Sequence, residues 1–566
     1  MNLIIKQYLS SLKERDELDA ILPDLLSQMG LNVFSRPGKG TRQDGVDVAA
    51  VGKIGEDTEK VYLFSIKAGD LTRILWDGDP IQSLRPSLNE IIDSYIPNRL
   101  PSEHKNKDIV ICICLGGDIQ EQVRLDVEGY IKQNAKGRIL FEEWNGDKLA
   151  SLIESNFLKE ELLPENTRNE LRKSLALLDE PESSYQHFSN LIKSITSAKG
   201  PKANATLMAM RQFYICLWIL FGWCREASNL ESAYLSSEFV LLNSWEIAKP
   251  YFTKRTKSAQ AIQLTFQSIL TIYYQISTQY SVKILPHTFS RHSLSVATMA
   301  SGSLDVNLKL FDLLGRLALA GIWANWAAVG MSESNPDDGA ASKQMAKGFS
   351  NAVKEIIHNN PILLLPIKDD QAIDISIAVL LLLLDQESYD EISGWITEIA
   401  ARATLAHKIH AQYPCNLQSY SELLDHPMKN NEDYRQRVTS GSILFPLIAL
   451  WAAILGNDDL YHQIQSIKEE LLKHCTFQFW YPDNSSEAYL YTNSDAHGAT
   501  LSNPCIDRSS KEYMEQILGE CDQTPQYKTL SAVKNRLWPM ILVACRLYRL
   551  PVPVQLWRDF YKQNSN

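Results

Sequence analysis

The chain has 566 residues, of which 45% are hydrophobic and 22% charged, and its formal net charge is −11. At roughly 100–200 residues per domain, this length predicts two to four domains, and the composition is typical of an ordinary globular protein. The negative balance argues against a chain that coats nucleic acid through bulk positive charge. It does not exclude a nuclease, because metal-dependent active sites are locally acidic.

Cysteine usage and hydropathy predict a cytoplasmic protein with no membrane partner. The nine cysteines are irregularly spaced, and the first residues carry early charges without a long apolar stretch, which favours reduced thiols over secretion. Two apolar runs, 372–384 and 440–456, are shorter than the ~20 residues that a spanning helix needs. We therefore expect both to be buried core helices.

The first 157 residues alternate between helical and strand patterns. In chain order we expect a helix at 14–29, a strand at 31–37, a turn-rich loop at 37–45, strands at 46–52 and 61–68 that form a hairpin, a helix at 82–96, a strand at 108–117, a helix at 120–135, a strand at 138–144 and a helix from 145. Pro23 lies inside the first helix and predicts a kink or a break there. The sum is a mixed α/β domain over residues 1–157.

Helical patterns dominate the remainder of the chain. Residues 158–184 are charge-rich and indicate a helical connector, and residues 185–566 predict one or more α-helical domains built from antiparallel helices, with no convincing strand pattern. Their role is not readable from the pattern. Residues 480–511 form a polar stretch that is long for a connection.

Candidate chemistry gathers on the predicted hairpin. Asp47 opens the strand 46–52, while Ser65 and Lys67 are two residues apart on the strand 61–68 and so share one face. A carboxylate and a backbone carbonyl such as that of Ile66 are hard oxygen ligands suited to Mg²⁺ or Mn²⁺. Such a cation activates water and stabilises charge on a phosphate, and a neighbouring lysine supports the same transition state.

This pattern resembles the Mrr-like branch of the PD-(D/E)XK nuclease superfamily, which has the restriction endonuclease-like fold. The resemblance rests on residues 44–48 (Asp-Gly-Val-Asp-Val), on residues 64–67 (Phe-Ser-Ile-Lys), on the acids Glu17 and Asp19 ahead of a leucine-rich turn, and on the closing segment 143–149. It covers about a quarter of the chain. It implies a metal-dependent DNA endonuclease in which Asp47 binds Mg²⁺ or Mn²⁺, Glu17 or Asp19 completes the charge and Lys67 orients the attacking water.

By analogy the resemblance also implies restriction or antiviral defence in a prokaryote. The helical region would then sense a trigger, recognise a target, form a homo-oligomer or bind a protein from the same defence operon. An analogy between folds is weaker evidence for a function than the residues of the site are.

One departure from the family pattern leaves an alternative open. Ser65 stands where the family has Glu, Gln or Asp, and a hydroxyl is a poorer Mg²⁺ ligand than a carboxylate. The alternative is a catalytically degenerate nuclease fold that serves as a binding or assembly module. A third hypothesis is metal-free RNA cleavage by the helical region, since Arg402 and His407 have the spacing of HEPN ribonucleases.

Overall fold

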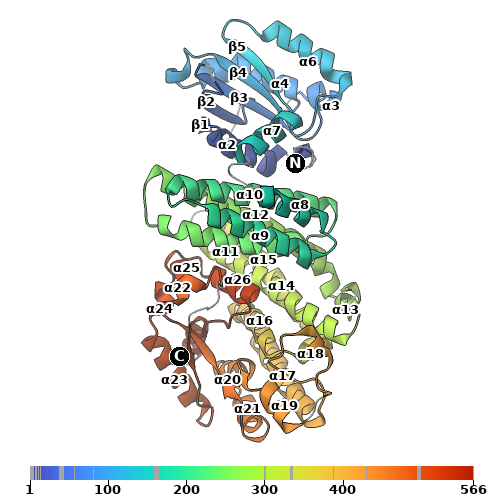
Figure 1. Cartoon of the computed structure of the whole chain (residues 1–566), viewed down its shortest axis with the longest axis vertical. Coiled ribbons are helices and arrows are strands. Elements are labelled where there is room, and N and C mark those ends of the chain that lie inside the picture. The colour runs from blue at the N-terminus through green and yellow to red at the C-terminus, as the bar shows by residue number, and fades with distance from the viewer. Residues whose placement is uncertain are drawn as a thin grey trace. The chain divides into compact units, whose positions relative to one another are not determined.

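The computed structural model describes residues 5–6, 9–10, 12, 14–36, 44–55, 58–80, 82–157, 165–298, 301–331, 336–385, 388–428, 431–493 and 499–564. Its contacts divide the chain into two compact units (Figure 1). Unit 1 comprises Met1–Val240 and Thr253–Ile272, and unit 2 comprises Leu241–Phe252 and Tyr273–Asn566. The expected domain boundary at residue 157 stays a prediction.

Unit 1 begins with a five-stranded mixed sheet. Its strands are β1 (Asn32–Ser35), β2 (Val48–Gly52), β3 (Lys60–Lys67), β4 (Ile109–Leu115) and β5 (Ile139–Trp144), and they lie in that order across the sheet. The pairs β1–β2 and β2–β3 are antiparallel, whereas β3–β4 and β4–β5 are parallel. The expected hairpin and mixed α/β domain are confirmed.

Helices cover the sheet on its two faces (Figure 1). One core joins strand residues such as Leu63 and Ile111 to α4 (Leu84–Glu90) and α6 (Glu121–Asn134). On the other side, α2 (Asp19–Gln28) and α7 (Gly146–Phe157) contact each other as well as β2 and β5 respectively. The sequence pattern had not indicated α3 (Arg73–Asp77), whose Trp76 is buried in the first core.

The opening helix continues through its proline. A π-helical turn, η1 (Glu14–Leu18), runs directly into α2, and Pro23 is buried inside α2. The expected break is therefore wrong, because the flanking side chains Ile21, Leu22 and Leu25 are buried and hold the helix against its neighbours. Proline removes one donor, which here costs the carbonyl four residues earlier its usual partner.

Further helices belong to unit 1. The predicted connector contains α8 (Glu165–Ala176), and α9 (Pro181–Ala198) and α10 (Ala203–Glu226) follow. The chain then continues in α11 (Glu231–Ala248) and α12 (Lys257–Thr288), each of which begins in unit 1 and ends in unit 2. Because α10 contacts both α2 and α7, part of the helical region packs on the α/β domain.

Unit 2 is mainly helical. Its longer helices are α14 (Ser303–Met331), α15 (Pro336–Asn359), α16 (Ala372–Leu384), α17 (Tyr389–Ile409), α20 (Leu444–Leu455), α21 (Asp458–Glu470), α23 (Ser510–Gln523) and α26 (Pro539–Tyr548). Four short strands interrupt them and form two pairs, β6 (Gly441–Ser442) with β7 (Thr476–Phe477) and β8 (Phe479–Pro482) with β9 (Ala499–Ser502). The expectation of a strand-free region is therefore wrong, and the long polar stretch 480–511 contains one of these pairings.

The most apolar helices are largely buried. The segments 372–384 and 440–456 correspond to α16 and α20, whose side chains lie almost entirely in the core, as expected. Among the described residues, α10 and α14 are long and apolar enough to cross a membrane, and 83% and 67% of their most apolar windows are buried. Core helices of soluble proteins meet the same criterion, so this finding alone indicates little about a membrane.

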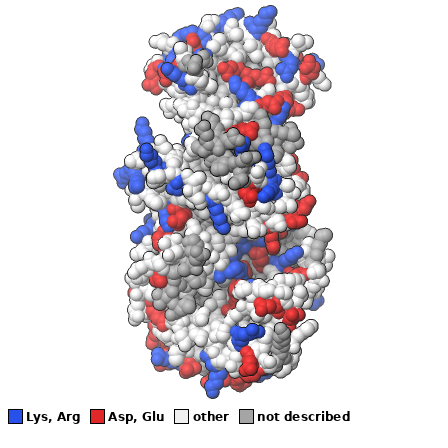
Figure 2. Space-filling view, in the orientation of Figure 1, with Lys and Arg blue, Asp and Glu red and all other residues white. Residues whose placement is uncertain are grey.

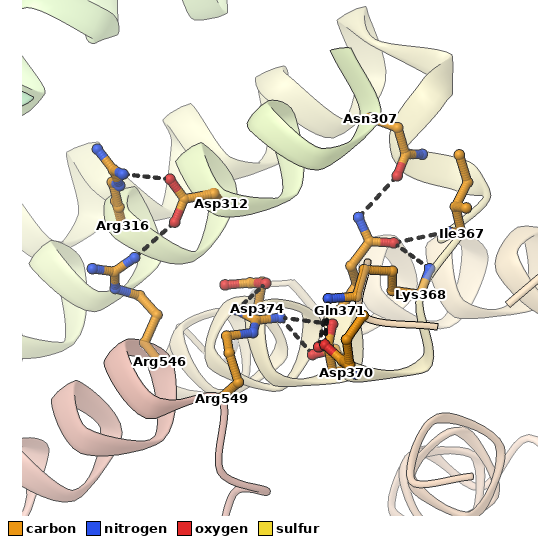
Figure 3. A network of polar contacts seen from close by, with 11 residues as sticks. Asn307, Asp312, Arg316, Ile367, Lys368, Asp370, Gln371, Asp374, Arg546 and Arg549 are labelled. Atoms are coloured by element: carbon orange, nitrogen blue, oxygen red, sulfur yellow. Dashed lines mark hydrogen bonds and ion pairs between the residues drawn. The ribbon is translucent and has the colours of Figure 1, made fainter. Parts of the chain in front are cut away.

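A network of charged side chains ties the C-terminal part of unit 2 to its central helices (Figure 3). Arg546 of α26 and Arg316 of α14 both contact the Asp312 carboxylate, at 2.7 and 2.6 Å. Arg549, just after α26, pairs with Asp374 of α16 at 2.9 Å and with Asp370. These ion pairs thus join residues near the end of the chain to α14 and α16, which lie far from them in the sequence.

Candidate active site

The start of β2 and the end of β3 lie at the same edge of the sheet, because the two strands are antiparallel. Asp47 comes directly before β2, and its backbone N–H donates to the Phe64 carbonyl at 2.8 Å, which extends the ladder by one residue. Lys67 is the last residue of β3. The hairpin therefore brings the two residues that the sequence selected to a common edge.

The Asp47 carboxylate is fixed by the neighbouring strand. Its Oδ2 accepts a hydrogen bond from the backbone N–H of Ile66 at 2.8 Å. Burial raises the pKa of Asp47 to about 6, and the nearby carboxylates of Glu14 and Asp19 add to the rise. The Ile66 N–H and the Lys67 ammonium oppose it. Three carboxylates and one ammonium therefore interact at this edge.

Lys67 is paired with an acid that the sequence pattern did not indicate. Lys67 is only 6% exposed, and its Nζ lies 3.1 and 3.2 Å from the two carboxylate oxygens of Glu14. A buried ammonium needs such a partner, since desolvation is otherwise costly. Glu14 lies in η1, four residues before the buried Leu18, so the inward helical spacing was the signal that could have identified it.

Of the two acids that the sequence indicated on the opening helix, Asp19 can be placed near Asp47 and Glu17 cannot be placed. Asp19, the first residue of α2, is near enough to Asp47 to raise the pKa of that carboxyl. Glu17 lies in η1, but its side chain is outside the described part of the chain. The predicted use of the Ile66 carbonyl as a ligand stays a prediction, and the N–H of the same residue bonds to Asp47.

Ser65 is buried beside this group of charges. It is 1% exposed, and its Oγ has no hydrogen-bond partner among the described residues. Buried hydroxyls normally find a partner. An unsatisfied oxygen two residues before Lys67 on the same strand is consistent with a missing ligand, and equally with a site that has lost its second carboxylate.

A tight turn places Asp47. Asp44 and Gly45 both have positive φ, 47° and 81°, and the Asp44 carboxylate pairs with Arg99 at 2.5 Å. A Cβ at Gly45 would lie 2.0 Å from the Ser87 carbonyl oxygen of α4. Only glycine fits so close an approach, so α4 fixes the backbone two residues ahead of Asp47.

Helix α10 contacts the helix that carries the acids. Arg211 of α10 is 9% exposed and donates from Nη1 to Oε1 of Gln28 at 2.9 Å. Burial lowers the pKa of Arg211, and the Asp24 carboxylate on α2 opposes that effect. Reciprocally, burial raises the pKa of Asp24 and Arg211 limits the rise. The position of α2 therefore depends on the first long helix of the helical region.

The donor set fits a hard divalent cation. Glu14, Asp19 and Asp47 supply carboxylate oxygens, and Ser65 supplies an unsatisfied hydroxyl, which are the donor types that Mg²⁺ and Mn²⁺ take. In the present arrangement Glu14 faces Lys67. Within the described ranges, no three His, Cys, Asp or Glu side chains are already grouped as a metal centre.

The residues of the RNA-cleavage hypothesis are differently placed. Arg402 is half exposed and pairs with Glu398 on the same helix at 3.1 Å. His407 is 3% exposed and stacks on Tyr413 with ring centroids 4.2 Å apart. A side chain buried in this way has no access to a nucleic acid, which disfavours the third hypothesis.

Comparisons of the chain with family models, with curated proteins and with solved structures found no match.

Proposed function

We propose that the chain is a metal-dependent DNA endonuclease whose N-terminal domain is of the restriction endonuclease-like, PD-(D/E)XK type. The observation that carries the proposal is the meeting of Glu14, Asp47 and Lys67 at one edge of the sheet. Glu14 comes from the opening helix, Asp47 stands directly before β2, and Lys67 is the last residue of β3. A buried ammonium beside an aspartate of raised pKa is an arrangement that clusters at functional sites.

The reaction is hydrolysis of a phosphodiester. Water attacks phosphorus, one P–O bond of the backbone breaks, and the departing oxygen takes up a proton. When bound, Mg²⁺ or Mn²⁺ supplies a water of lowered pKa and neutralises charge on the phosphate. Asp47, with Asp19, would hold the cation, Lys67 would orient the water, and Glu14 would orient the Lys67 ammonium.

Cleavage of supercoiled plasmid with and without Mg²⁺ or Mn²⁺ tests the proposal. We expect nicking by the wild type, and a loss on the order of 10²-fold or more in Asp47→Ala and Lys67→Ala, as for other deleted charge-stabilising groups. Glu14→Gln should lose activity with less effect on folding than removal of the whole side chain. Lys107→Ala is the control, and this variant should cleave normally, since Lys107 pairs with Glu59 away from the site.

The second candidate function is a degenerate nuclease fold that only binds or assembles. Ser65 favours it, because this position lacks the carboxylate that would complete the cation site. No cleavage by the wild type at any concentration of either metal, alone or with proteins encoded beside it, would select this candidate and reject the enzyme.

The biological setting that we propose is prokaryotic restriction or antiviral defence in the cytoplasm. The helical region would sense a trigger, recognise a target, or assemble the protein with itself or with a defence partner. This part of the proposal rests on analogy alone.

A further inference from the structure

Two long stretches of this acidic chain contain no acid at all. Residues 183–225 hold five Lys or Arg and residues 247–304 hold six, without one Asp or Glu. The remainder of the chain carries the other 45 of the 56 basic residues and all 67 acidic ones. Exposed helices usually mix acidic and basic residues and pair Lys with Glu one turn away. The absence of acidic residues therefore sets these two stretches apart from the rest of the chain.

Eight of these cations belong to unit 1, and six of the eight lie in the last two turns of α9, in the turn before α10 or around the start of α12. The six are Lys193 of α9, Lys199 and Lys202 in the turn before α10, and Lys254, Arg255 and Lys257 at the start of α12. Five are exposed, and Lys199 is partly covered, with its Nζ 3.4 Å from the Thr206 hydroxyl. We call these six residues the basic end.

The packing of α9 on α11 indicates that the basic end is one surface. The hydroxyls of Ser184 and Ser232 lie 2.5 Å apart, and Lys193 Nζ lies 5.8 Å from the Phe239 ring. The two helices therefore run side by side in the same direction. At ~1.5 Å per residue, α9 and α11 end about 21 and 24 Å beyond the two serines. The turn after α9 and the turn after α11 therefore begin at about the same height along the two parallel helices.

The surface view agrees with this arrangement. Figure 2 shows Lys and Arg side chains projecting together at the left edge, at the level of helices α10 to α12 in Figure 1, with few acidic atoms among them. A surface of this kind attracts a polyanion with closely spaced charges, and duplex DNA carries one charge per ~1.7 Å of helix axis.

We propose that the basic end binds the phosphate backbone of duplex DNA without reading its sequence. The choice of DNA among polyanions rests on the proposed function, for which the α/β part of the same unit needs a substrate held nearby. Lysine and arginine side chains that bind phosphates position a protein on a duplex and carry no base specificity. The basic end would thus supply binding that an overall charge of −11 does not.

Binding of a short fluorescent DNA duplex by the full-length protein tests the inference. Anisotropy is measured in EDTA, so that no metal-dependent cleavage takes place, at several NaCl concentrations between about 50 and 200 mM. We expect the combined variant Lys254→Gln, Arg255→Gln, Lys257→Gln to weaken binding. Each phosphate that the variant no longer neutralises should reduce the slope of log K against log salt by about 1, so the triple variant should reduce it by about 3.

A second triple variant controls for net charge. Lys132→Gln, Lys136→Gln, Arg138→Gln removes the same number of exposed Lys and Arg from the last turn of α6 and the turn before β5, at the opposite ends of the parallel strands from Lys67. It should leave the slope within about 1 of the wild type. All six positions are exposed, so thermal unfolding should be unchanged in both variants.

The outcomes separate this inference from the nuclease proposal. Equal weakening by both triple variants, no binding by the wild type, or an effect confined to duplex RNA or anionic phospholipid vesicles overturns the inference. Salt-dependent DNA binding that is weakened only in the first variant supports it even if the wild type cuts nothing. Cleavage that the first variant performs normally at every salt concentration supports the nuclease and rejects the basic end.

Discussion

The buried charged side chains at this edge of the sheet depend on one another, because burial disfavours charged groups. Burial raises the pKa of Asp47 to about 6, because its charged form loses hydration, and the Glu14 carboxylate adds to the rise. The same carboxylate pairs with the buried Lys67 ammonium at 3.1 Å. The group carries more acid than base, which is the condition in which a divalent cation stabilises a site.

The variant Ser65→Ala tests whether the Ser65 hydroxyl binds a cation or only packs in the core. Because the Ser65 Oγ bonds to none of the described residues, its removal leaves no partner unsatisfied, and we expect the free energy of unfolding to change by less than about 0.5–1 kcal/mol. If the hydroxyl binds the cation, the metal concentration needed for half-maximal cleavage should rise. The measurements are urea unfolding and a Mg²⁺ titration of activity. An unchanged titration would assign Ser65 to packing alone.

His407 predicts a loss of stability in acid. Burial lowers its pKa from 6.5 to about 3, with smaller contributions from Arg435, His426 and His474, and its ring stacks on Tyr413. Between these pH values the unfolded chain binds the proton more readily. Its contribution to stability is therefore present above pH 6.5 and is lost as the pH falls toward 3, by at most about 1.4 kcal/mol per pH unit.

The variant His407→Phe isolates that contribution. Phenylalanine can stack on Tyr413 but cannot titrate, so the free energy of unfolding should depend less on pH below 6.5 than in the wild type. His462 is exposed, and His462→Phe should leave the dependence as it was. Parallel curves for wild type and His407→Phe would show that His407 is protonated equally in both states.

At the scale of elements, the turn before β2 predicts a backbone effect. Gly45→Ala must adopt φ +81° and place a Cβ 2.0 Å from the Ser87 carbonyl oxygen. We expect a loss of about 3 kcal/mol or more, since strain and a steric clash add. Gly55 also has positive φ, +68°, but no atom of the described residues lies within 4 Å of a Cβ placed there, so Gly55→Ala should cost only about 1 kcal/mol.

Urea unfolding and plasmid cleavage measure the two consequences of that turn. Gly45→Ala should lower activity as well as stability, because Asp47 follows two residues later, whereas Gly55→Ala should cleave normally. Similar losses in the two variants would mean that α4 moves aside and does not fix the turn.

The elements of the α/β domain were predictable because their signals are local. Short apolar runs marked β2 and β3, a longer continuous apolar run marked β4, and the short spacing between β2 and β3 made a hairpin the natural connection. Pro23 misled because tertiary packing of the flanking leucines outweighs one absent hydrogen bond. The strands β8 and β9 escaped detection because their pairing joins residues separated by a polar segment.

For the molecule as a whole, long-range partners limit what the sequence can reveal. Asp47 and Lys67 could be selected because the hairpin alone sets their positions. The spacing of the acids among themselves does not single out Glu14, because only its helical spacing from the buried Leu18 indicates which face of η1 lies against β3. The link from Arg211 to Gln28 spans 183 residues, and no local pattern predicts it.

The same limit applies to the polar network of unit 2, which predicts a large loss on mutation (Figure 3). Asp374 is 1% exposed, and Gly315 leaves room for its carboxylate, since a Cβ there would lie 2.4 Å from Oδ1. Burial raises the pKa of Asp374 to about 6, and the Arg549 guanidinium limits the rise. Removing Arg549 would therefore leave a buried carboxylate without its cation.

We expect Arg549→Met to lower the free energy of unfolding by about 2–4 kcal/mol, somewhat below the range for a fully buried pair because Arg549 is partly exposed. Asp374→Asn should be less harmful in the Arg549→Met background than alone, with a coupling of about 1–3 kcal/mol in the double-mutant cycle. Arg402→Met is the control, since its pair with Glu398 is exposed on both sides and should contribute less than about 1 kcal/mol. If Arg549→Met costs no more than Arg402→Met, the network does not hold the C-terminal segment on α16.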